Sequence, residues 1–353
     1  MNAVIHTEYM DMTKGVGKED LARAGEMVRR GGLVAFPTET VYGLGGDALR
    51  ADAARKIYAA KGRPSDNPLI VHIADMADLP AIVTNIPDSA RMLAKRFWPG
   101  PLTMIFPKSD QVPLETTGGL NTVAVRMPDH PVALGLIKAA GGYIAAPSAN
   151  LSGRPSPTRA AHVIEDLSGR IDAVIDGGPV QIGLESTIVD LTGDGPVMLR
   201  PGFISQGMLE DALGCKVALD PGMAGLSENE RPKAPGMKYR HYAPKADLCI
   251  VEGDREKVIA YIRSQVQKGE AGGEKIGIIT CSEDAPDYPA GIVRSLGSLS
   301  HEEEIAGHLF AALREFDDLT VNAIYSEAFN TPQLGNAIMN RLMKAAGGRR
   351  IIL

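Results

Sequence analysis

The chain has 353 residues, more than one ordinary hydrophobic core holds, so two domains are expected. A hydrophobic fraction of 44% and a charged fraction of 23% are typical of a globular protein, and the net charge of -6 disfavours a protein that coats nucleic acid, although it does not exclude a local basic patch. The amino-terminal residues lack the apolar core of a secretory signal, no apolar run approaches a membrane span, and the three cysteines are widely spaced, so we expect a cytoplasmic protein with reduced thiols.

The first part of the chain alternates predicted helices with predicted strands. Hydrophobic periodicity and Gly or Pro boundaries place helices at 18–30, 51–60, 88–97 and 131–140, and strands at 33–37, 69–73, 122–127, 143–146, 173–175, 187–191 and 197–199. The run LIVHI at 69–73 is continuously apolar, as in a strand buried on both faces. This alternation predicts an α/β domain.

The pattern fades near residue 207, and residues 220–245 are rich in Pro, Gly and charge, which is the composition of a linker. Met237, Tyr239, His241 and Tyr242 are unusual in a passive spacer. A second α/β unit follows, with strands expected at 248–251, 276–280, 292–296 and 322–326, and helices at 254–267, 301–316 and 333–346. It contains no GxGxxG turn, so no dinucleotide site is predicted there.

Two segments combine an apolar strand with a dense run of hydroxyls, glycines and prolines. They are LVAFPTETVYGLGGD at 33–47 and YIAAPSANLSGRPSPT at 143–158. A buried strand that ends in small polar residues is typical of a ligand site at the carboxyl edge of an open α/β sheet. Two such segments in one chain predict one site in which both segments contact the same ligand.

The segment KGRPSDNPLIVHI adds cations to this edge. Lys61 and Arg63 follow the end of a predicted helix, and Asn67 and His72 flank the next strand. Two cations and an amide beside a glycine-rich edge could bind a nucleotide phosphate. The alternative is a solvated helix end whose cations interact with the helix dipole.

Arg126 and Arg200 each lie at the end of an apolar strand, where a buried guanidinium needs an anionic partner. That partner is either a ligand or an internal Asp or Glu. Two such arginines converge more readily on one ligand than on two separate structural partners.

Several catalytic classes are excluded by missing motifs. The sequence has no G-x-S-x-G elbow, no H-E-x-x-H, no paired CxxC and no P-loop, which argues against a nucleophilic triad, a metal held by protein ligands and a Walker-type NTPase. The remaining reading is an adenylate-forming type of site, in which cations bind phosphates, hydroxyls make polar contacts and Mg²⁺ enters with the nucleotide.

The motifs PTETVYGLG, KGRPSDNPLIVHI, PSANLSGRPSPT and LESTIVD, in this order, resemble the threonylcarbamoyl-AMP synthase family with its YrdC-like domain. KYRHYAP and LGNAIMNRLMKAA resemble the long, two-domain form. The resemblance implies a YrdC-like domain at 18–207 with a twisted, open, mixed sheet, a linker or lid at 208–246, and a smaller Rossmann-like α/β domain at 247–353.

The resemblance also implies the activity of a nucleotidyltransferase. Such an enzyme condenses L-threonine, bicarbonate or carbon dioxide, and ATP into threonylcarbamoyl-adenylate and releases pyrophosphate. Partner proteins then transfer the threonylcarbamoyl group to an adenosine beside the anticodon of tRNA. Mg²⁺ is expected to be carried with ATP, and neither membrane binding nor stable nucleic-acid binding is expected.

Site residues follow from the resemblance motif by motif. The residues implied for threonine are Thr40, His72, Arg126, Ala146 and Ser186. Those implied for ATP are Arg63, Asn67, Thr122, Ser148, Ser156, Arg200 and His241. Lys61 and Arg63 would be the catalytic cations near the phosphates, and Tyr239 and Tyr242 would belong to a lid over the nucleotide. The alternative for the linker residues is simple anchoring of the linker on the first domain.

Two other functions are alternatives to this activity. Hydrogenase-maturation carbamoyltransferases also contain a YrdC-like domain, but they resemble larger chains with paired CxxC zinc motifs and an acylphosphatase domain. A non-catalytic RNA-binding module would need a face rich in Lys and Arg, whereas this chain is acidic and carries complete hydroxyl motifs.

Overall fold

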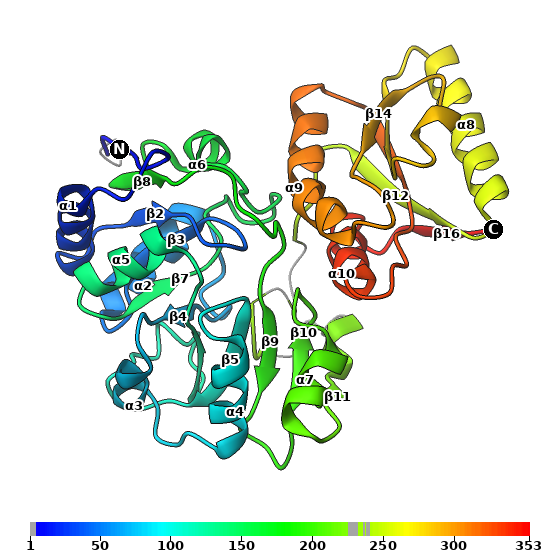
Figure 1. The fold of residues 1–353 in the computed structure, drawn as a ribbon. Helices are drawn as coiled ribbons and strands as arrows, with labels where there is room; N and C mark the ends of the chain where they lie inside the picture. Colours follow the sequence, from blue (N-terminus) through cyan, green and yellow to red (C-terminus); the bar gives the residue numbers. More distant parts are fainter. Residues whose placement is uncertain (1–4, 225–231, 236, 238–240) are drawn as a thin grey trace. The chain divides into compact units, whose positions relative to one another are not determined.

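The computed structural model describes residues 5–224, 232–235, 237 and 241–353. The chain divides into two compact units (Figure 1). The first unit comprises Met1–Ser152, Pro157–Gln181 and Glu185–Tyr239. The second comprises Arg240–Leu353 together with two short segments from earlier in the chain, Gly153–Ser156 and Ile182–Leu184.

The first unit is built on a mixed sheet in which 11 strands are hydrogen-bonded among the described residues, in the order β1-β8-β2-β3-β7-β4-β6-β5-β9-β10-β11. The strands are β1 (Glu8–Asp11), β2 (Val34–Phe36), β3 (Gly43–Asp47), β4 (Ile70–His72), β5 (Leu102–Pro107), β6 (Thr122–Arg126), β7 (Ile144–Ala146), β8 (Ala173–Asp176), β9 (Thr187–Asp190), β10 (Val197–Arg200) and β11 (Ala218–Leu219). The mixture of parallel and antiparallel pairs confirms the predicted mixed α/β sheet.

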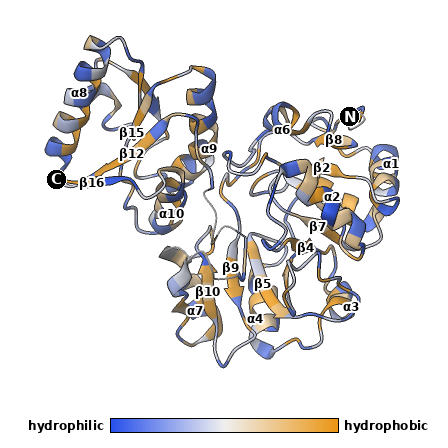
Figure 2. Cartoon of the chain, turned by 180° about the vertical axis from the view of Figure 1, so that it is seen from behind, coloured by the Kyte–Doolittle hydropathy of each residue, from blue (hydrophilic) through white to orange (hydrophobic). Residues whose placement is uncertain are grey.

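The helices of the first unit are α1 (Lys18–Arg29), α2 (Ala51–Lys61), α3 (Leu79–Ile82), α4 (Asp88–Phe97), α5 (Pro131–Ala139), α6 (Ala160–Leu167) and α7 (Gln206–Leu213). Helices other than α1 and α5 cover one face of the sheet along most of its length. Ile57 of α2, Leu93 of α4 and Val163 of α6 join the core that contains Val71 and Val125 of the sheet. This face is the larger hydrophobic layer of the unit, and Figure 2 shows the strands as mainly hydrophobic.

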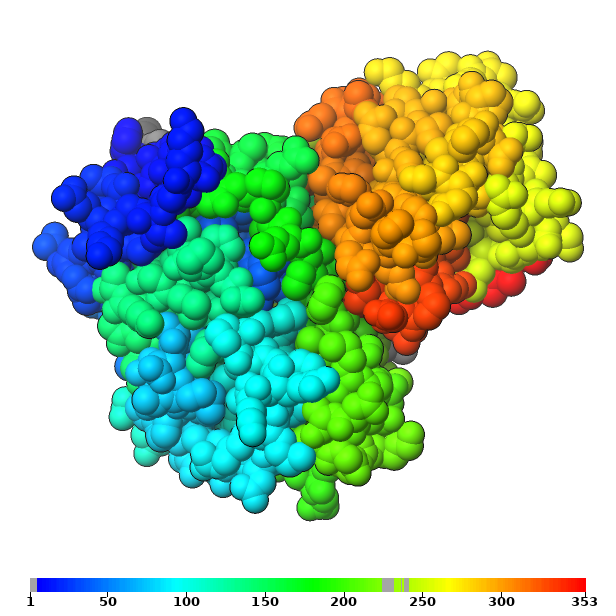
Figure 3. Space-filling view, viewed as in Figure 1, coloured from blue at the N-terminus to red at the C-terminus, as the bar shows by residue number. Residues whose placement is uncertain are grey.

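The opposite face is covered by α1 and α5 over β2, β7 and β8 only. Val28 of α1 and Leu136 of α5 pack with Val34, Ile144 and Ile175. The two helices approach closely because α1 has a glycine at its contact with α5, where an added Cβ would lie 2.6 Å from backbone atoms of α5. In the space-filling view, the blue amino-terminal part and the blue-green α5 lie at the surface of the unit (Figure 3).

The rest of this second face, over β4, β6, β5, β9 and β10, carries a smaller cluster that no helix of the unit joins. Ile70, Ala124 and Ile188 pack there with two residues of the linker, Ala234 and Met237. Ala234 and Met237 of the linker therefore lie on the part of the sheet that α1 and α5 leave uncovered.

The second unit has a five-stranded parallel sheet among its described residues, in the order β14-β13-β15-β12-β16, which fits the predicted Rossmann-like domain. Its strands are β12 (Asp247–Glu252), β13 (Ile276–Thr280), β14 (Ile292–Ser295), β15 (Ala323–Glu327) and β16 (Arg350–Ile352), and its helices are α8 (Arg255–Ala271), α9 (Glu302–Asp318) and α10 (Gly335–Ala345). None of the helices in the described part of the chain is both long and apolar enough to cross a bilayer.

The largest difference from the sequence-based expectation is β3. Residues 43–47, GLGGD, were expected to form part of a ligand loop, but they pair with both β2 and β7. A Cβ at Gly45 would lie 2.8 Å from the side chains of Ile144 and Phe36, so glycine is needed for close packing between strands at this position. Strand β1 and helices α6 and α7 were also not predicted.

Candidate active site

Three polar side chains form a row across neighbouring strands on the uncovered face. His72 of β4 is the register partner of Arg126 of β6, and Arg126 is the register partner of Thr103 of β5. Register partners point to the same side of a sheet. All three residues are at most 4% exposed, so polar and charged groups are held here without bulk solvent.

Arg126 forms an internal ion pair, which is one of the two alternatives left open by the sequence. Its Nη2 lies 2.7 Å from Oε1 of Glu39, and its Nε donates a long hydrogen bond of 3.4 Å to the carbonyl of Gly100. Glu39 comes from the turn PTET, next to Thr40. Glu39 is not among the residues predicted from the sequence, although the need of a buried arginine for an anionic partner is a signal that points to a nearby acid.

His72 is neutral in the folded protein. Burial, and secondarily the charge of Arg126, lowers the pKa of His72 from 6.5 to about 3. Its Nδ1 lies 3.1 Å from the carbonyl oxygen of Ile70, which fits a protonated Nδ1 that donates to this oxygen. The neutral imidazole therefore adds no second positive charge beside Arg126.

A chain of hydrogen bonds links this row to Arg200. The hydroxyls of Thr103 and Ser186 lie 2.7 Å apart. Arg200 donates from Nε to the carbonyl of Ser186 at 3.0 Å and from Nη2 to its hydroxyl at 3.2 Å. Its Nη1 donates to the carbonyl of Pro235 in the linker at 3.3 Å. The second strand-end arginine thus approaches the same face as the first and contacts the linker.

Lys61 is buried rather than solvated. It is 2% exposed, and its Nζ donates to the carbonyls of Ser148 and Asn150, both at 2.5 Å. Helix α2 ends after Lys61 because Gly62 adopts the left-handed conformation, with φ of 64°. The interpretation of Lys61 as a solvated helix cap is therefore wrong, and this cation holds the hydroxyl-rich segment after β7 against α2.

The other predicted ATP residues of the first unit occupy nearby segments. Arg63 is half-buried and donates from Nη2 to the carbonyl of Pro68 at 3.1 Å. Asn67 is 1% exposed, and its Oδ1 accepts no hydrogen bond from the described residues. Thr122 is half-buried and begins β6, on the same face as Arg126 because the two differ by four positions along one strand.

Ala146 is the last residue of β7, and Ser148 lies in the hydroxyl-rich segment that follows this strand. Ala146 is 2% exposed and pairs with Ile70 of β4. Ser148 forms an isolated bridge with Gly43, and its hydroxyl donates to Oδ1 of Asn150 at 2.5 Å. The two hydroxyl-rich segments are thus joined through β3, so both can contribute to one site.

Ser156, His241 and Tyr242 belong to the second unit. Ser156 is buried, and the rings of His241 and Tyr242 lie 5.5 Å apart. The Tyr242 ring lies 4.9 Å from Phe310 of α9, and the backbone N–H of Ala243 donates to the carbonyl of Gly153 at 2.8 Å. This part of the linker is therefore anchored on α9, and Tyr239 lies outside the described residues.

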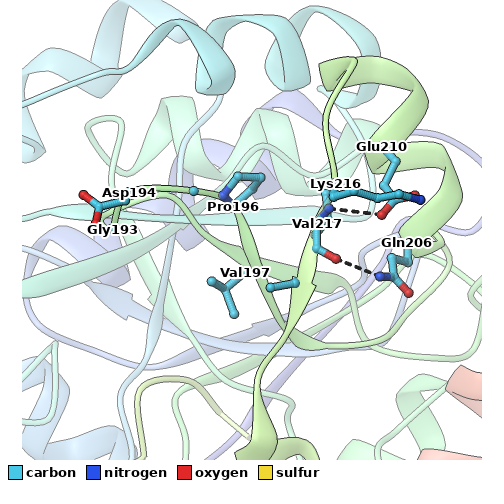
Figure 4. Close-up of a pocket in the computed structure, with 10 residues that line it drawn as sticks. Gly193, Asp194, Pro196, Val197, Gln206, Glu210, Lys216 and Val217 are labelled. Carbon is cyan, nitrogen blue, oxygen red and sulfur yellow. Dashed lines mark hydrogen bonds and ion pairs between the residues drawn. The ribbon is translucent and has the colours of Figure 1, made fainter.

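Two surface pockets of the first unit lie apart from these residues. One of about 520 Å³ is formed by α7, β11 and the start of β10, where Gln206 donates to the carbonyl of Val217 and Lys216 pairs with Glu210 (Figure 4). The other, of about 760 Å³, is lined by parts of α1 and α2 and by residues 169–172. Neither of these two pockets is lined by a predicted site residue.

Two arginines, a neutral histidine and two hydroxyl groups lie together on one face of the mixed α/β sheet, which suits a small polar ligand with an anionic group. Comparison with known proteins specifies the class. A family model described as telomere recombination matches residues 26–202, and one described as the carboxyl-terminal domain of threonylcarbamoyl-AMP synthase matches residues 204–347.

Similar proteins match almost the whole chain. The threonylcarbamoyl-AMP synthase of Bacillus subtilis is 50% identical over 97% of this chain and 98% of its own, and that of Pyrococcus abyssi is 51% identical over 93% and 94%. The crystal structure of Pyrococcus abyssi Sua5 complexed with L-threonine matches with a TM-score of 0.93 and 48% identity, covering 98% of this chain and 100% of that one. The chain belongs to the threonylcarbamoyl-AMP synthase family and is a nucleotidyltransferase, as the sequence motifs indicated.

Proposed function

We propose that the chain condenses L-threonine, bicarbonate or carbon dioxide, and ATP into threonylcarbamoyl-AMP and releases pyrophosphate. The observation that carries the proposal is the buried row of His72, Arg126 and Thr103 on the uncovered sheet face, extended by Ser186. A matching protein with bound L-threonine supports the choice of amino acid.

Arg126 is proposed to bind the carboxylate of threonine. A guanidinium can form two parallel hydrogen bonds with a carboxylate, and burial strengthens such charge-assisted bonds. Thr40, His72 and Ser186, all at most 4% exposed, supply short polar groups for the threonine hydroxyl and amine, while Ala146 limits the space on β7. The site thus contains groups complementary to each polar part of threonine.

ATP is proposed to lie against the cations and amides of the adjoining segments. The proposed contacts are Arg63, Asn67, Thr122, Ser148, Ser156, Arg200 and His241, with Lys61 close to the phosphates. Support comes from the unpaired acceptor of buried Asn67, the half-buried Thr122 and the link from Arg200 to Ser186. No protein nucleophile is required. The neutral amine of threonine adds to carbon dioxide with loss of a proton, or condenses with bicarbonate with loss of water, and an oxygen of the resulting carbamate attacks the α-phosphate as pyrophosphate leaves.

Mg²⁺ is proposed to enter with ATP, held by the phosphates. Among the described residues, one group of three side chains has the spacing of metal ligands, namely Cys281, Asp284 and Glu327 of the second unit. A thiol does not suit Mg²⁺, Asp284 is paired with Arg255, and Glu327 accepts a hydrogen bond of 2.6 Å from Tyr288. This group therefore does not fit a resident Mg²⁺.

The linker is proposed to act as a lid that excludes water from the carbamoyl-adenylate. Support comes from Ala234 and Met237, which pack on the sheet face that carries the site, and from the contact of Arg200 with the carbonyl of Pro235. We place the catalytic domain at 18–207, the linker at 208–246 and the carboxyl-terminal domain at 247–353. Tyr239 and Tyr242 would belong to the lid.

The product is proposed to serve transfer proteins that modify tRNA, because a mixed carbamoyl-phosphoric anhydride is an activated group donor and this chain needs only small substrates to make it. A cytoplasmic location is proposed from the three free cysteines.

The test is incorporation of isotope-labelled bicarbonate. Protein incubated with ATP, L-threonine and labelled bicarbonate should yield an AMP adduct that carries both threonine and the label in mass spectrometry. Arg126→Gln protein should yield almost none at the same threonine concentration. An AMP adduct without the label, or its absence with the wild-type protein, would contradict the proposal.

A further inference from the structure

Glu39 is a buried carboxylate whose hydrogen-bonding capacity is unused. It is 3% exposed, and neither of its oxygens accepts a hydrogen bond from the described residues. Its contact with Arg126 is an ion pair, in which Nη2 lies 2.7 Å from Oε1 without hydrogen-bond geometry. A carboxylate offers about four acceptor positions, and a buried charge is costly when these are not satisfied. Glu39 therefore has acceptor positions available to a donor inside the site.

The turn that carries Glu39 is held in place by its neighbour. The hydroxyl of Thr38 accepts the backbone N–H groups of Thr40 and Val41, both at 3.2 Å, and donates to the carbonyl of Val41 at 2.7 Å. Such a closed hydroxyl turn fixes the backbone on both sides of Glu39. The carboxylate is thus presented between two ordered threonines and does not lie on a freely moving loop.

The surrounding histidines do not neutralise Glu39. His72 is neutral because burial and Arg126 lower its pKa. Burial also lowers the pKa of His130, despite the opposing effect of Glu39, so its ring is largely uncharged near pH 7. Nδ1 of His130 already accepts the backbone N–H of Val132. The charges at this point of the site are therefore one guanidinium and one carboxylate, side by side.

We propose that Glu39 accepts the α-ammonium group of the amino acid whose carboxylate is bound by Arg126. The inference rests on the proposed function and deepens it, because it identifies the group that selects an α-amino acid. An amino-acid zwitterion carries a carboxylate and an ammonium group on the same carbon atom. The site places a guanidinium and a carboxylate side by side, so each charge of the ligand can meet a charge of opposite sign. Glu39 would fix the position of the ammonium nitrogen, which must first lose a proton before its lone pair forms the bond to the carbonyl carbon found in the product.

The charge balance explains the selectivity. The pair of Arg126 and Glu39 is neutral, and binding a zwitterion leaves the buried site neutral. A carboxylic acid without an amino group would add a negative charge beside Glu39, where the low dielectric makes repulsion strong. Glu39 therefore favours α-amino acids and opposes hydroxy acids that Arg126 and the hydroxyls could otherwise bind.

The test compares two ligands by calorimetry, both in the presence of ATP. They are L-threonine and (3R)-3-hydroxybutanoate, which retains the carboxylate and the hydroxyl but lacks the amino group. In Glu39→Gln protein, threonine should bind roughly thirtyfold more weakly or worse, because a buried charge partner is lost. 3-Hydroxybutanoate should bind equally or more tightly, because the repulsion is removed. ATP affinity within twofold of the wild type would confirm that the protein is folded.

A ratio of the two affinities that is unchanged in Glu39→Gln would overturn the inference and leave Glu39 as a counter-charge for Arg126. Wild-type protein that binds no threonine would instead contradict the proposed function. If Glu39→Gln does not fold, Glu39→Asp provides the comparison, because it keeps the charge but withdraws it by one methylene. Its threonine affinity should fall while 3-hydroxybutanoate is unaffected, and equal falls for both ligands would overturn the inference.

Discussion

His72 and Arg126 are register partners on the adjacent parallel strands β4 and β6, so an imidazole and a guanidinium lie side by side within the buried face of the sheet. The histidine is kept neutral mainly by burial and further by the neighbouring positive charge. Because His72 takes up its proton at a lower pH in the folded protein than in the unfolded chain, the stability of the first unit depends on pH.

The first prediction concerns this dependence. Because the pKa of His72 is about 3 in the folded protein and 6.5 ordinarily, the unfolded chain binds a proton at a higher pH than the folded chain. Above about pH 6.5 His72 is neutral in both states and does not lower the free energy of unfolding. As the pH falls from 6.5 towards 3, only the unfolded chain takes up the proton, so the folded protein loses stability. Between these values His72 should add up to about 1.4 kcal/mol per pH unit to the decline in the free energy of unfolding.

Urea unfolding followed by fluorescence of Trp98, the single tryptophan and a residue of the first unit, measures this slope. His72→Gln should be less stable at pH 7 but should show a shallower decline towards pH 4. The exposed His301→Gln is the matched control and should follow the wild-type curve. Equal slopes for wild type and His72→Gln would show that His72 is not the buried neutral group described.

The second prediction separates the two ligands. Arg126→Gln should weaken threonine binding by about 2–5 kcal/mol, because a buried charge-assisted contact is lost, and should leave ATP affinity nearly unchanged. Arg63→Gln should have the opposite selectivity. Isothermal titration of each ligand to each variant provides the measurement. Unchanged threonine affinity in Arg126→Gln would refute the assignment of its guanidinium to the carboxylate.

The third prediction concerns Lys61. Lys61→Met would leave the carbonyls of Ser148 and Asn150 without their buried donor, which costs about 1–3 kcal/mol for each unsatisfied group. We expect a lower melting temperature and weaker ATP binding. Lys56→Met is the matched control, because this exposed lysine of the same helix also donates to a backbone carbonyl, that of Gly31. Similar effects of the two substitutions would contradict a special role for Lys61.

Regular elements with a strong hydrophobic period could be predicted from the sequence, whereas packing details could not. Helix α4 has the predicted bounds, Asp88–Phe97, because Ala90, Leu93, Ala94 and Phe97 repeat at helical spacing and are buried. The glycine-rich strand β3 was not predicted, because glycine has low intrinsic strand preference and its place between β2 and β7 is set by tertiary pairing.

In the candidate site, too, positions within predicted strands could be predicted from the sequence, whereas contacts between distant residues could not. The strand-end position of Arg126 followed from the apolar run before it, and so did its need for an anionic partner, either a ligand or an internal acid. That the acid is Glu39, 87 positions earlier in the chain, depends on the order of strands in the sheet and on the turn held by Thr38. No local pattern in PTET distinguishes a buried carboxylate from an exposed one. Burial of Lys61 was likewise hidden by its position at a helix end.

The fourth prediction concerns the linker. Replacement of residues 238–243 by Gly and Ser at equal length should reduce synthesis and shorten the lifetime of threonylcarbamoyl-AMP, because water would reach the anhydride. The same replacement of the exposed loop 192–195 is the control. Trypsin should cut the native linker more slowly when ATP is present. Normal synthesis and lifetime, together with equal cleavage in both conditions, would show that the segment is only a tether.

The central claim is that one site joins three small substrates, and pyrophosphate release with each substrate omitted in turn tests it most directly. The account predicts release that requires ATP, L-threonine and bicarbonate together. L-Serine should be a poorer substitute for threonine, because one methyl group in a fitted pocket is worth about 1–3 kcal/mol. Equal pyrophosphate release without threonine or without bicarbonate would contradict the account.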